Sequence, residues 1–561
     1  MTYYAGITIG PIFDTISNAA IPAALWFASY FFSDLARRLC REVKARIPGA
    51  EIISPFYEET EENDGVGKYH DRIIFSTSHS GTKYALEEKL KTVIHSAVTE
   101  TGAAQERSIF PDKAIEPYSR EQFQEFLEEY LQIHFVILSR EETDGQNCIL
   151  AISPYLDALE LMKTFPKDSR VDPFRRMFAR KDVLRDDGNW LIKQSSLFPA
   201  GNGGNNFLVN RAGNIRSIAE IARTGKDPEL KQEYYYAVVS ADGDSMGAFL
   251  EGLKNEHISF FSKGCLAYAQ EAAKRIYAYG GMPIYAGGDD LLFLAPLSGP
   301  DGQSIVSFCH SLRKLFADTI QTEFTKGFRG AHPNEDPPNL NFTTLSFGVA
   351  VQFEKFPLYE ATSRARELLK MAKDTKQFGE KDNILLELRK HSGQSSALLI
   401  HNPDIQAFEE LSKAARGDGV DSEKPTALLY TLQHFRAVVS VLIDNTRKRL
   451  NREGRTEDCH PDTIKKDFVA AWGNLFDNPG QEVSEAYTKN IADAYFTQLL
   501  LEKRRLLVPK HAYREEFRDK SLRALVNVLL WEKFLREKVS EQERADASGD
   551  GKARGKEEEK A

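Results

Sequence analysis

The run PIYAGGDDLLFLAPL, Pro283 to Leu297, places two glycines and two aspartates between two apolar stretches that are rich in β-forming residues. Consecutive glycines in such a position suit a tight turn that needs positive φ. The sequence therefore predicts a buried β-hairpin with Asp289 and Asp290 at or beside its tip. The ordinary alternative is a solvated turn, because Gly and Asp are common turn residues.

A second acidic motif favours a functional site over a solvated turn. The predicted strand in EYYYAVVSADGDSMG ends in Asp242 and Asp244. If this strand neighbours the hairpin, Asp242 lies near Asp289 and Asp290. Carboxylates packed so closely raise one another's pKa, and a bound Mg²⁺ or Mn²⁺ removes that penalty through oxygen ligands. The sequence thus predicts a two-metal site for nucleotidyl transfer, although a lone D-G-D is also a common surface loop.

Both acidic motifs lie in one predicted α/β unit. The helical sequence ISFFSKGCLAYAQEAAKRIYAYG separates the first motif from the hairpin. A helix from Ser304 to Phe324, the strand FTTLSFGVAVQF, the helix LYEATSRARELLKMAKDTKQ and the strand DNILLEL complete the unit. This order predicts a ferredoxin-like palm core with an extra hairpin.

The N-terminal segment has a similar order. It begins with the strand YYAGITIGP, a helix from about Ser17 to Arg46, and the strands AEIISPFY and DRIIFSTS. A further helix and the strand HFVIL complete a β-α-β-β-α-β unit, so the chain carries a coarse internal duplication. Beyond about residue 400 the pattern is almost wholly helical, and the tail ASGDGKARGKEEEKA has too few apolar residues to fold alone.

The predicted fold class is α+β, with two ferredoxin-like palm domains, a helical insert between them and a C-terminal all-helical domain. The expected domains are a first palm at 1–150, a helical and loop insert at 151–228, a second palm with the GGDD site at 229–395, a helical bundle at 396–545 and a disordered charged tail at 546–561.

Net charge and cysteine spacing bear on which partners and cofactors the chain can have. The formal net charge of -9 gives no global signal for nucleic-acid binding, and it leaves room for a local basic surface. The locally basic C-terminal helices either pack on partner subunits or RNA, or are solvated faces with i,i+4 ion pairs. None of the five cysteines forms a C-x-x-C pair, so neither a zinc site nor a disulfide framework is expected.

The apolar run AAIPAALWFASYFF, Ala19 to Phe32, is the one candidate for a targeting or membrane segment. It has no positively charged leader, contains Pro22, and is shorter than the roughly 20 residues that a membrane span needs. We expect a buried helix there, no membrane partner and a cytoplasmic protein.

At this point the residues resemble a known family. The stretches YYYAVVSADGDSMGAFLEG, GGMPIYAGGDDLLFLAPL, LSFGVAV, PLYEATSRARELLKMAK and NILLELRKHSGQ follow the order found in the second palm of the large subunit of type III CRISPR effector complexes. The N-terminal ITIGPIFDTISNAAIPAALWFASYFFSDL and GVGKYHDRIIF are similar to that family's first palm. The resemblance covers most of residues 1–395 and is strongest between 233 and 395.

The resemblance implies that the second palm converts ATP into cyclic oligoadenylates when the complex binds target RNA beside its guide RNA and partner subunits. It implies that Asp242, the Gly243 carbonyl, Asp289 and Asp290 are metal ligands, the last two being the catalytic acids. Lys373 falls where related cyclases place a triphosphate-binding lysine; its alternative is a solvated helix lysine. The nucleotide-binding residues expected in all are Gly287, Gly288, Asp244, Ser245, Ser346, Lys373, Ser29 and Ser33.

Two departures from the family and two rival functions stay open. The chain begins at the first palm, with His70-Asp71 as its only His-Asp pair, so a form without the HD nuclease domain and without DNA cleavage is expected. The family's cysteine zinc site is also missing. The rivals are a stand-alone cyclic dinucleotide synthase and a non-catalytic scaffold that holds guide RNA and neighbouring subunits.

Overall fold

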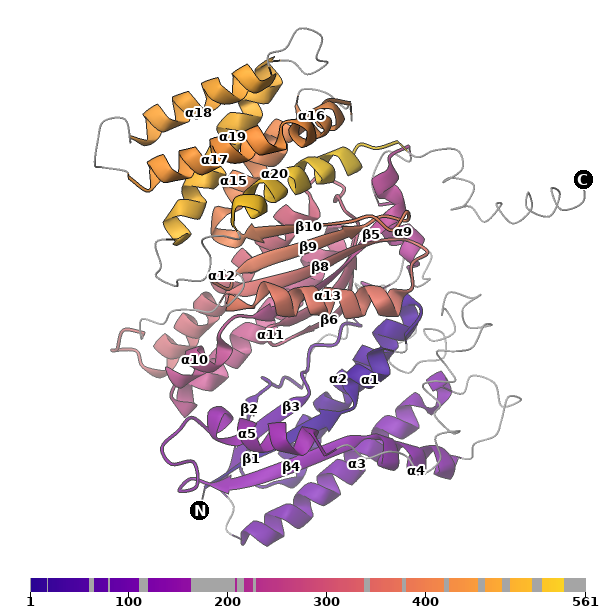
Figure 1. Ribbon diagram of the computed structural model, residues 1–561. Coiled ribbons are helices and arrows are strands. Elements are labelled where there is room, and N and C mark those ends of the chain that lie inside the picture. The colour runs from indigo at the N-terminus through magenta and orange to yellow at the C-terminus, as the bar shows by residue number, and fades with distance from the viewer. Residues whose placement is uncertain are drawn as a thin grey trace, which may run out of the picture.

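The computed structural model of the chain contains two β-sheet units and a helical unit, which follow one another along the molecule (Figure 1). The described residues are 2–17, 19–59, 65–78, 81–109, 120–162, 207–208, 216–224, 229–337, 344–375, 380–417, 423–452, 460–476, 485–506 and 517–538. The expected tail at 546–561 lies outside them, as does most of the expected insert at 151–228.

The first unit is a four-stranded antiparallel sheet in the order β2-β3-β1-β4. With two helical crossovers, this order is the ferredoxin-like arrangement predicted from the sequence. The bounds are β1 Tyr3–Gly10, α1 Ile12–Ile16, α2 Pro22–Arg46, β2 Ala50–Ser54, β3 Arg72–Thr77, α3 Lys83–Ile109, α4 Arg120–Tyr130, β4 Gln132–Ser139 and α5 Cys148–Glu160.

Two helices of this unit differ from the sequence-based expectation. The long helix begins at Pro22 rather than near Ser17, because proline fixes φ and lacks an N–H, which suits the first helical turn and not the helix interior. Helix α5 continues across the boundary expected at residue 150 and packs on β1 and β4. Gly6 allows this close approach, since a Cβ there would lie 2.4 Å from Ile152.

The second unit is a six-stranded sheet in the order β10-β9-β8-β5-β7-β6. Its core β8-β5-β7-β6 repeats the ferredoxin-like order, and α13 connects β8 to the parallel strand β9. The bounds are α9 Ile218–Ala222, β5 Tyr235–Gly243, α10 Met246–Glu251, α11 Asn255–Ala278, β6 Met282–Gly287, β7 Asp290–Ala295, α12 Ile305–Ala331, β8 Leu345–Phe353, α13 Leu358–Ala372, β9 Asn383–Arg389 and β10 Ser395–His401.

The edge strand β10 was not anticipated from the sequence. It pairs with β9 from Ser395 to His401 and therefore lies across the boundary expected at residue 395. Helix α20 packs on it, and the Asn527 amide donates to the Ala397 carbonyl at 2.6 Å. The helical unit beyond comprises α15 Ile405–Arg416, α16 Glu423–His434, α17 Arg436–Leu450, α18 Pro461–Phe476, α19 Glu485–Leu506 and α20 Phe517–Phe534.

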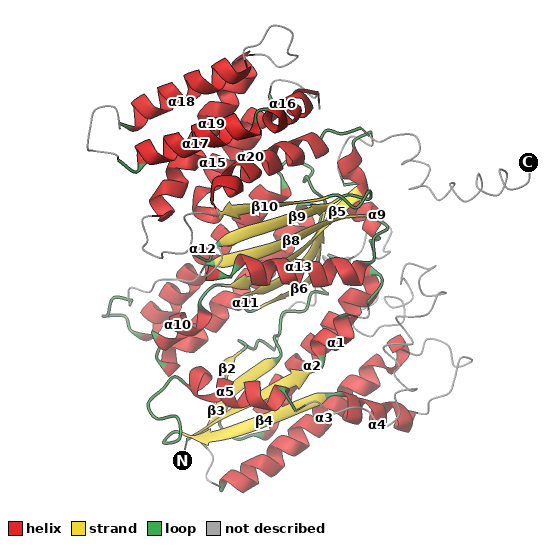
Figure 2. Cartoon of the chain, viewed as in Figure 1, coloured by secondary structure: helices red, strands yellow, loops and turns green. Residues whose placement is uncertain are grey.

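Alternation along β5 divides the protein interior into two cores. Tyr235, Ala237 and Val239 face α11 and α12, in a core that continues into the C-terminal helices. Tyr236 and Val238 face α13, in a core that continues through α2 into the first palm. The two sheet units therefore share apolar packing, and Figure 2 shows their sheets stacked with helices between and around them.

The expectation that the apolar N-terminal run is a buried helix is confirmed from Pro22 onward, where α2 lies inside the shared core. No single described helix is both long and apolar enough to cross a membrane; the pair Pro425–His434 and Arg436–Leu450, bent by 86°, meets that threshold only when taken together. The described cysteines are buried free thiols.

Candidate active site

Three carboxylates meet where β5 ends beside the β6–β7 hairpin. Gly287 pairs with Asp290 across a two-residue turn made of Gly288 and Asp289. On the neighbouring strand Ala241 pairs with Leu291, which places Asp242 level with the hairpin tip. Carboxylate oxygens of Asp242, Asp289 and Asp290 all lie within 4.8 Å of one another. The structure therefore brings together the three acids that the sequence selected.

Two glycines make this convergence possible. Gly288 has φ +65°, a left-handed conformation that non-glycine residues rarely adopt. Gly243 follows Asp242, and a Cβ at Gly243 would lie 2.4 Å from Asp289 Oδ2 and 2.9 Å from Asp289 Cβ. Any side chain at Gly243 would therefore push the Asp289 carboxylate out of the group.

The two acids of the hairpin, Asp289 and Asp290, have raised pKa values. Desolvation by the surrounding protein, followed by the charge of Asp242, raises the pKa of Asp289 to about 6. Desolvation and the charges of Asp289 and Asp242 raise the pKa of Asp290 well above its ordinary value, although its side chain still reaches solvent. Such a group of acids attracts cations, because a positive charge relieves the mutual repulsion.

Lys373 supplies a positive charge to this group. It follows the last residue of α13, and its Nζ forms an ion pair with Asp242 and donates to the Gly243 carbonyl at 2.6 Å. Asp242 lies on the α13 face of the sheet because it shares the strand parity of Tyr236 and Val238. The Lys373 side chain is thus largely covered and lies beside the acids, and its role in binding a triphosphate stays a prediction.

Asp244 and Ser346 form a buried hydrogen-bond network beside the acids, and Ser346 pairs with Asp242 across β5 and β8. The Asp244 carboxylate accepts from Ser346 Oγ at 2.9 Å, Thr344 Oγ1 at 2.8 Å and the Asp382 amide at 3.0 Å. Burial raises the pKa of Asp244, while these hydrogen bonds lower it. Both side chains thus hold the segment before β9, and their role as nucleotide-binding residues stays a prediction. Ser245 is exposed, in a left-handed conformation directly after this network.

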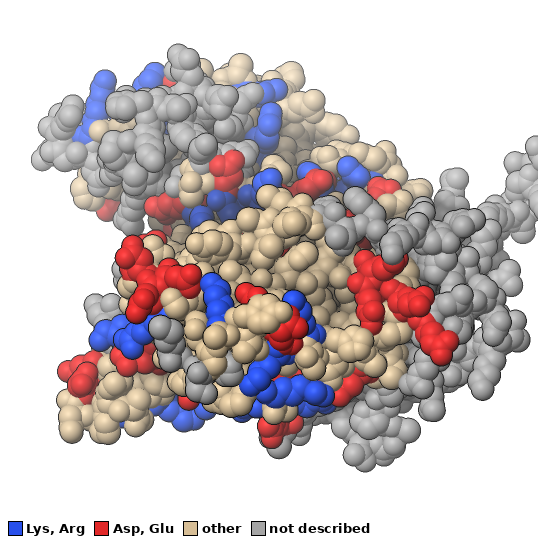
Figure 3. Space-filling view, turned by 90° about the horizontal axis from the view of Figure 1, so that it is seen from below, with Lys and Arg blue, Asp and Glu red and all other residues tan. Residues whose placement is uncertain are grey.

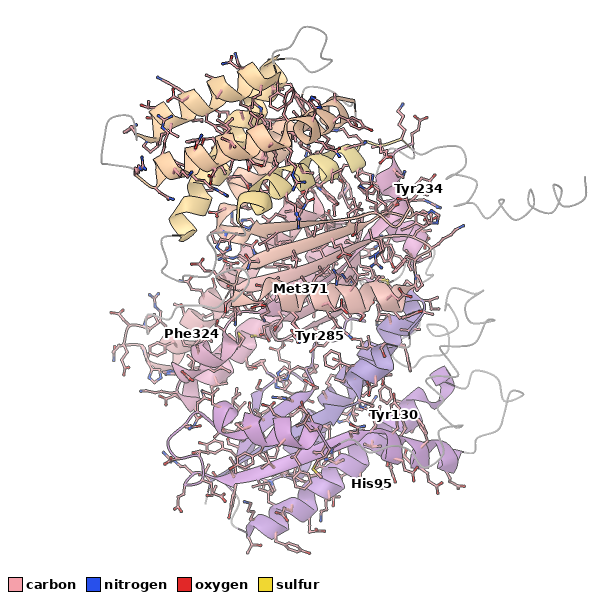
Figure 4. All side chains as sticks on the ribbon, viewed as in Figure 1. His95, Tyr130, Tyr234, Tyr285, Phe324 and Met371 are labelled. Atoms are coloured by element: carbon pink, nitrogen blue, oxygen red, sulfur yellow. The ribbon has the colours of Figure 1, made fainter. Side chains whose placement is uncertain are left out.

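The first palm contacts the hairpin directly. Its loop 65–70 forms a parallel bridge between Gly67 and Tyr285, and the Ala286 amide donates to the Gly67 carbonyl at 2.9 Å. A Cβ at Gly287 would lie 3.0 Å from the Lys68 carbonyl, so this glycine accommodates the first palm. Figure 4 shows Tyr285 between the two units, with Met371 on α13 above it.

One of the two serines expected at the nucleotide supports this loop. Ser29 and Ser33 are both buried on α2, one turn apart. Ser33 Oγ accepts from the Tyr69 amide at 2.9 Å, and the nearby Trp26 indole donates to the Gly65 carbonyl at 2.6 Å. The structure therefore connects Ser33 to the hairpin through the loop.

Sequence reasoning missed the residues that face the acids from outside the two motifs. His70 lies beside Gly288, with its Nε2 3.1 Å from Ser54 Oγ, and burial lowers its pKa to about 4. The Arg366 guanidinium on α13 lies 4.7 Å from the ring centroid of Phe13 in the first palm. Burial lowers the pKa of Arg366, and the charge of Asp290 opposes that shift. Arg366 lies two helical turns before Lys373, and this spacing of two basic residues on one helix could have indicated Arg366 from the sequence.

The fold and the acids together define a palm domain, in which three carboxylates meet at the end of one strand and at the turn of the adjoining hairpin. Residues 235–385 match the family model of the Cas10/Cmr2 second palm domain, which confirms the resemblance noted in the sequence for this segment. A curated relative, the CRISPR system Cmr subunit Cmr2 of Pyrococcus furiosus, is 26% identical over 200 residues, covering 31% of this chain and 21% of the relative.

Solved structures also match the chain, with TM-scores below 0.5. A type III-B Cmr-beta structure in the apo state matches with a TM-score of 0.48 and 11% identity, over 90% of this chain and 82% of that chain. A Csm1-Csm4 cassette in complex with AMPPNP matches with a TM-score of 0.45 and 13% identity, over 88% of this chain and 70% of that chain. The curated match spans only about a fifth of its relative's length.

Proposed function

We propose that this chain is the nucleotidyl cyclase subunit of a type III CRISPR effector complex, which joins ATP molecules into cyclic oligoadenylates when target RNA is bound. The observation that carries the proposal is the convergence of Asp242, Asp289 and Asp290 with Lys373 beside them. A non-catalytic scaffold has no need of three mutually repelling acids, of which Asp289 and Asp290 have raised pKa values.

The residues present fit a pair of divalent cations. Carboxylates of Asp242, Asp289 and Asp290, together with the Gly243 carbonyl, form an all-oxygen donor set of the kind that Mg²⁺ and Mn²⁺ prefer. Lys373 Nζ already contacts Asp242 and the Gly243 carbonyl, which is evidence that these two oxygens attract a positive charge. The chemistry that bound Mg²⁺ or Mn²⁺ would supply is activation of a 3′-hydroxyl and neutralisation of charge at the α-phosphate.

Lys373 has two roles in the proposed reaction. In the nucleotide-free protein its ammonium group neutralises Asp242. When the acids receive their cations, the ammonium group is released and can donate to the triphosphate of the incoming ATP. The new bond joins the 3′-oxygen of one nucleotide to the α-phosphorus of the next, and pyrophosphate leaves. Lys373 would then stabilise the negative charge on the leaving pyrophosphate.

Two nucleotides must lie side by side for this reaction, and the palms offer unequal places for them. The second palm carries the acids. The first palm offers the neutral hydroxyls of Ser29 and Ser33 and the loop 65–70, which packs on the hairpin. We infer that the first palm holds the nucleotide or ribose that needs no metal. The expected preference for adenine as the base follows from the family resemblance.

Mass spectrometry of the products tests the proposal. The purified chain is incubated with ATP and Mg²⁺ or Mn²⁺, with and without copurifying RNA and subunits. We expect cyclic oligoadenylates that depend on RNA, and no product from Asp289→Ala with Asp290→Ala. Asp336→Asn, an exposed acid on the same domain, serves as the matched control with full activity.

The other outcomes distinguish the rival functions. An RNA-independent cyclic dinucleotide, or equal use of GTP, would favour a stand-alone synthase. Absence of any product with the complex fully assembled would favour a scaffold. On the face seen from below, the Lys and Arg side chains of the described residues are interspersed with Asp and Glu (Figure 3), so these residues form no uniform basic surface for RNA there. We propose that guide and target RNA contact this subunit elsewhere, in a cytoplasmic complex.

A further inference from the structure

Three side chains with metal-binding atoms meet at the ends of two helices, apart from the acids of the palm site. Glu256 and His257 lie in the first turn of α11, and His332 is the C-terminal cap of α12. One ligand atom from each lies within 4.8 Å of the other two. Because His257 and His332 are 75 positions apart, no sequence spacing could have indicated this group.

The three side chains are held in different ways. The His257 ring is buried, and its Nε2 lies 3.6 Å from Glu256 Oε1. The rings of His257 and His332 have centroids 5.9 Å apart and are nearly perpendicular, at 89°. The backbone amide of His332 donates to the Phe328 carbonyl at 2.8 Å, which fixes the end of α12. Glu256 is exposed and can adjust to a bound ion.

An aromatic cluster explains the position of His257 but not its chemistry. The ring packs against Phe260, Phe324 and Phe328 with centroid distances of 5.2–6.2 Å, and Figure 4 labels Phe324 in this region. A phenylalanine would satisfy such packing. Among the described residues, the charged partner of the His257 ring is Glu256, so the imidazole edge that is not covered by phenylalanines faces the acid and His332.

Two imidazoles and one carboxylate are a ligand set for Zn²⁺ and similar transition metals, whereas Mg²⁺ prefers oxygen ligands alone. Tetrahedral coordination leaves a fourth position for water or for the exposed Glu335, whose charge acts on His257. Lys254 lies 3.9 Å from Glu256, and because it is largely exposed it can turn away into solvent.

We propose that Glu256, His257 and His332 form a Zn²⁺ site that joins the start of α11 to the end of α12. This proposal departs from the expectation that the chain has no zinc site, which was drawn from its cysteines, because the three ligands are two histidines and a glutamate. The ion would fix the helix end from which the chain proceeds to Thr344, the residue that donates to Asp244 beneath the palm acids. The proposal is independent of the proposed cyclase function.

Titration calorimetry with Zn²⁺ on the EDTA-stripped full chain tests the site, with Mg²⁺ in excess so that the palm acids are occupied. We expect one Zn²⁺ per chain. His332→Gln and Glu256→Gln should each weaken binding, the first at least tenfold. His460→Gln is the matched control, because His460 is an exposed histidine with its Nδ1 3.6 Å from Asp462 Oδ2. The affinity of His460→Gln for Zn²⁺ should equal that of the parent chain.

Two further measurements keep the test independent of folding defects. Without metal, thermal unfolding of His332→Gln and Glu256→Gln should match the parent chain, and Zn²⁺ should raise the unfolding temperature of the parent chain only. Co²⁺ should give the intense d–d absorption of a tetrahedral site, and His332→Gln should remove it. No Zn²⁺ binding by the stripped chain, or unchanged affinity in the double variant His332→Gln with Glu256→Gln, would overturn the proposal.

Discussion

Replacing Asp289 by asparagine should stabilise the metal-free protein at neutral pH, although it removes a residue of the proposed catalytic group. The pKa of Asp289 rises from its ordinary 3.8 to about 6 in the folded state, through desolvation first and the charge of Asp242 second. An acid with a raised folded pKa favours unfolding once it is ionised. Stability is therefore lost as the pH rises from 3.8 through about 6, and it remains reduced above that window.

The size of the effect follows from the shift. A change of about two pKa units corresponds to about 3 kcal/mol at roughly 1.36 kcal/mol per unit. The side chain is half-buried, and Lys373 already offsets part of the repulsion, so solvent screening reduces the expected gain to about 1–2 kcal/mol. For a domain of this size, that gain raises the unfolding temperature by roughly 2–6 °C.

The unfolding temperatures of the parent chain and of Asp289→Asn are compared in EDTA at two pH values. At about pH 7.5 the variant should be more stable than the parent, and at about pH 4 the difference should disappear. Asp336→Asn, an exposed substitution on the same domain, should change neither temperature. Mg²⁺ should stabilise the parent chain and not Asp289→Asn, because only the parent retains the complete group of acids. If Asp289→Asn is no more stable than the parent at neutral pH, or if its gain persists at about pH 4, then Asp289 does not carry the electrostatic strain inferred here.

Four further changes test other parts of the site. Lys373→Met should tighten Mn²⁺ binding about tenfold in titration calorimetry, because no ammonium group competes for Asp242, while turnover of ATP falls; weaker Mn²⁺ binding would contradict the counter-ion role. Gly243→Ala should abolish product formation at a cost of about 1–3 kcal/mol in stability, seen by denaturant unfolding, because the new Cβ displaces Asp289. Asp242→Ala should remove one of two sites for a non-hydrolysable ATP analogue in calorimetry and largely keep the other; one site in the parent chain would refute the two-palm arrangement. Ser346→Ala should destabilise the fold by about 1–3 kcal/mol because Asp244 loses a buried donor, with the affinity for Mg²⁺ less affected than by Asp242→Ala.

The sequence predicted the parts of this molecule that depend on local pattern. The acids at the end of β5 and the glycines of the hairpin predicted that Asp242, Asp289 and Asp290 meet, on the condition that the strand and the hairpin are sheet neighbours. The two ferredoxin-like orders followed from the succession of strands and helices. The start of α2 at Pro22 was missed, although proline's fixed φ was a readable signal.

Long-range placement could not be predicted in the same way. Asp244 belongs to the same D-G-D motif as Asp242, yet the chain turns after Gly243 and brings Asp244 to Ser346 and the Asp382 amide instead of the other acids. Only the tertiary position of β8 and β9 decides this. The edge strand β10 was likewise hidden, because its side chains gain their burial from α20, about 130 positions later in the chain.

The asymmetry between the palms follows from how their hairpins meet. In the second palm the hairpin turn carries acids, and its glycines leave room for the first palm's backbone at the Lys68 carbonyl. In the first palm the corresponding loop, residues 65–70, is occupied with Ser33 and with Tyr285 of the second palm, and the acid that follows it, Asp71, accepts from the Ile9 amide through its backbone carbonyl at 3.1 Å. A second group of acids at that loop would lie against the first and add to the repulsion that already raises the pKa of Asp289. The first palm thus adds a single acid to this surrounding, since the charge of Asp71 contributes to the raised pKa of Asp290, and the three converging acids all come from the second palm.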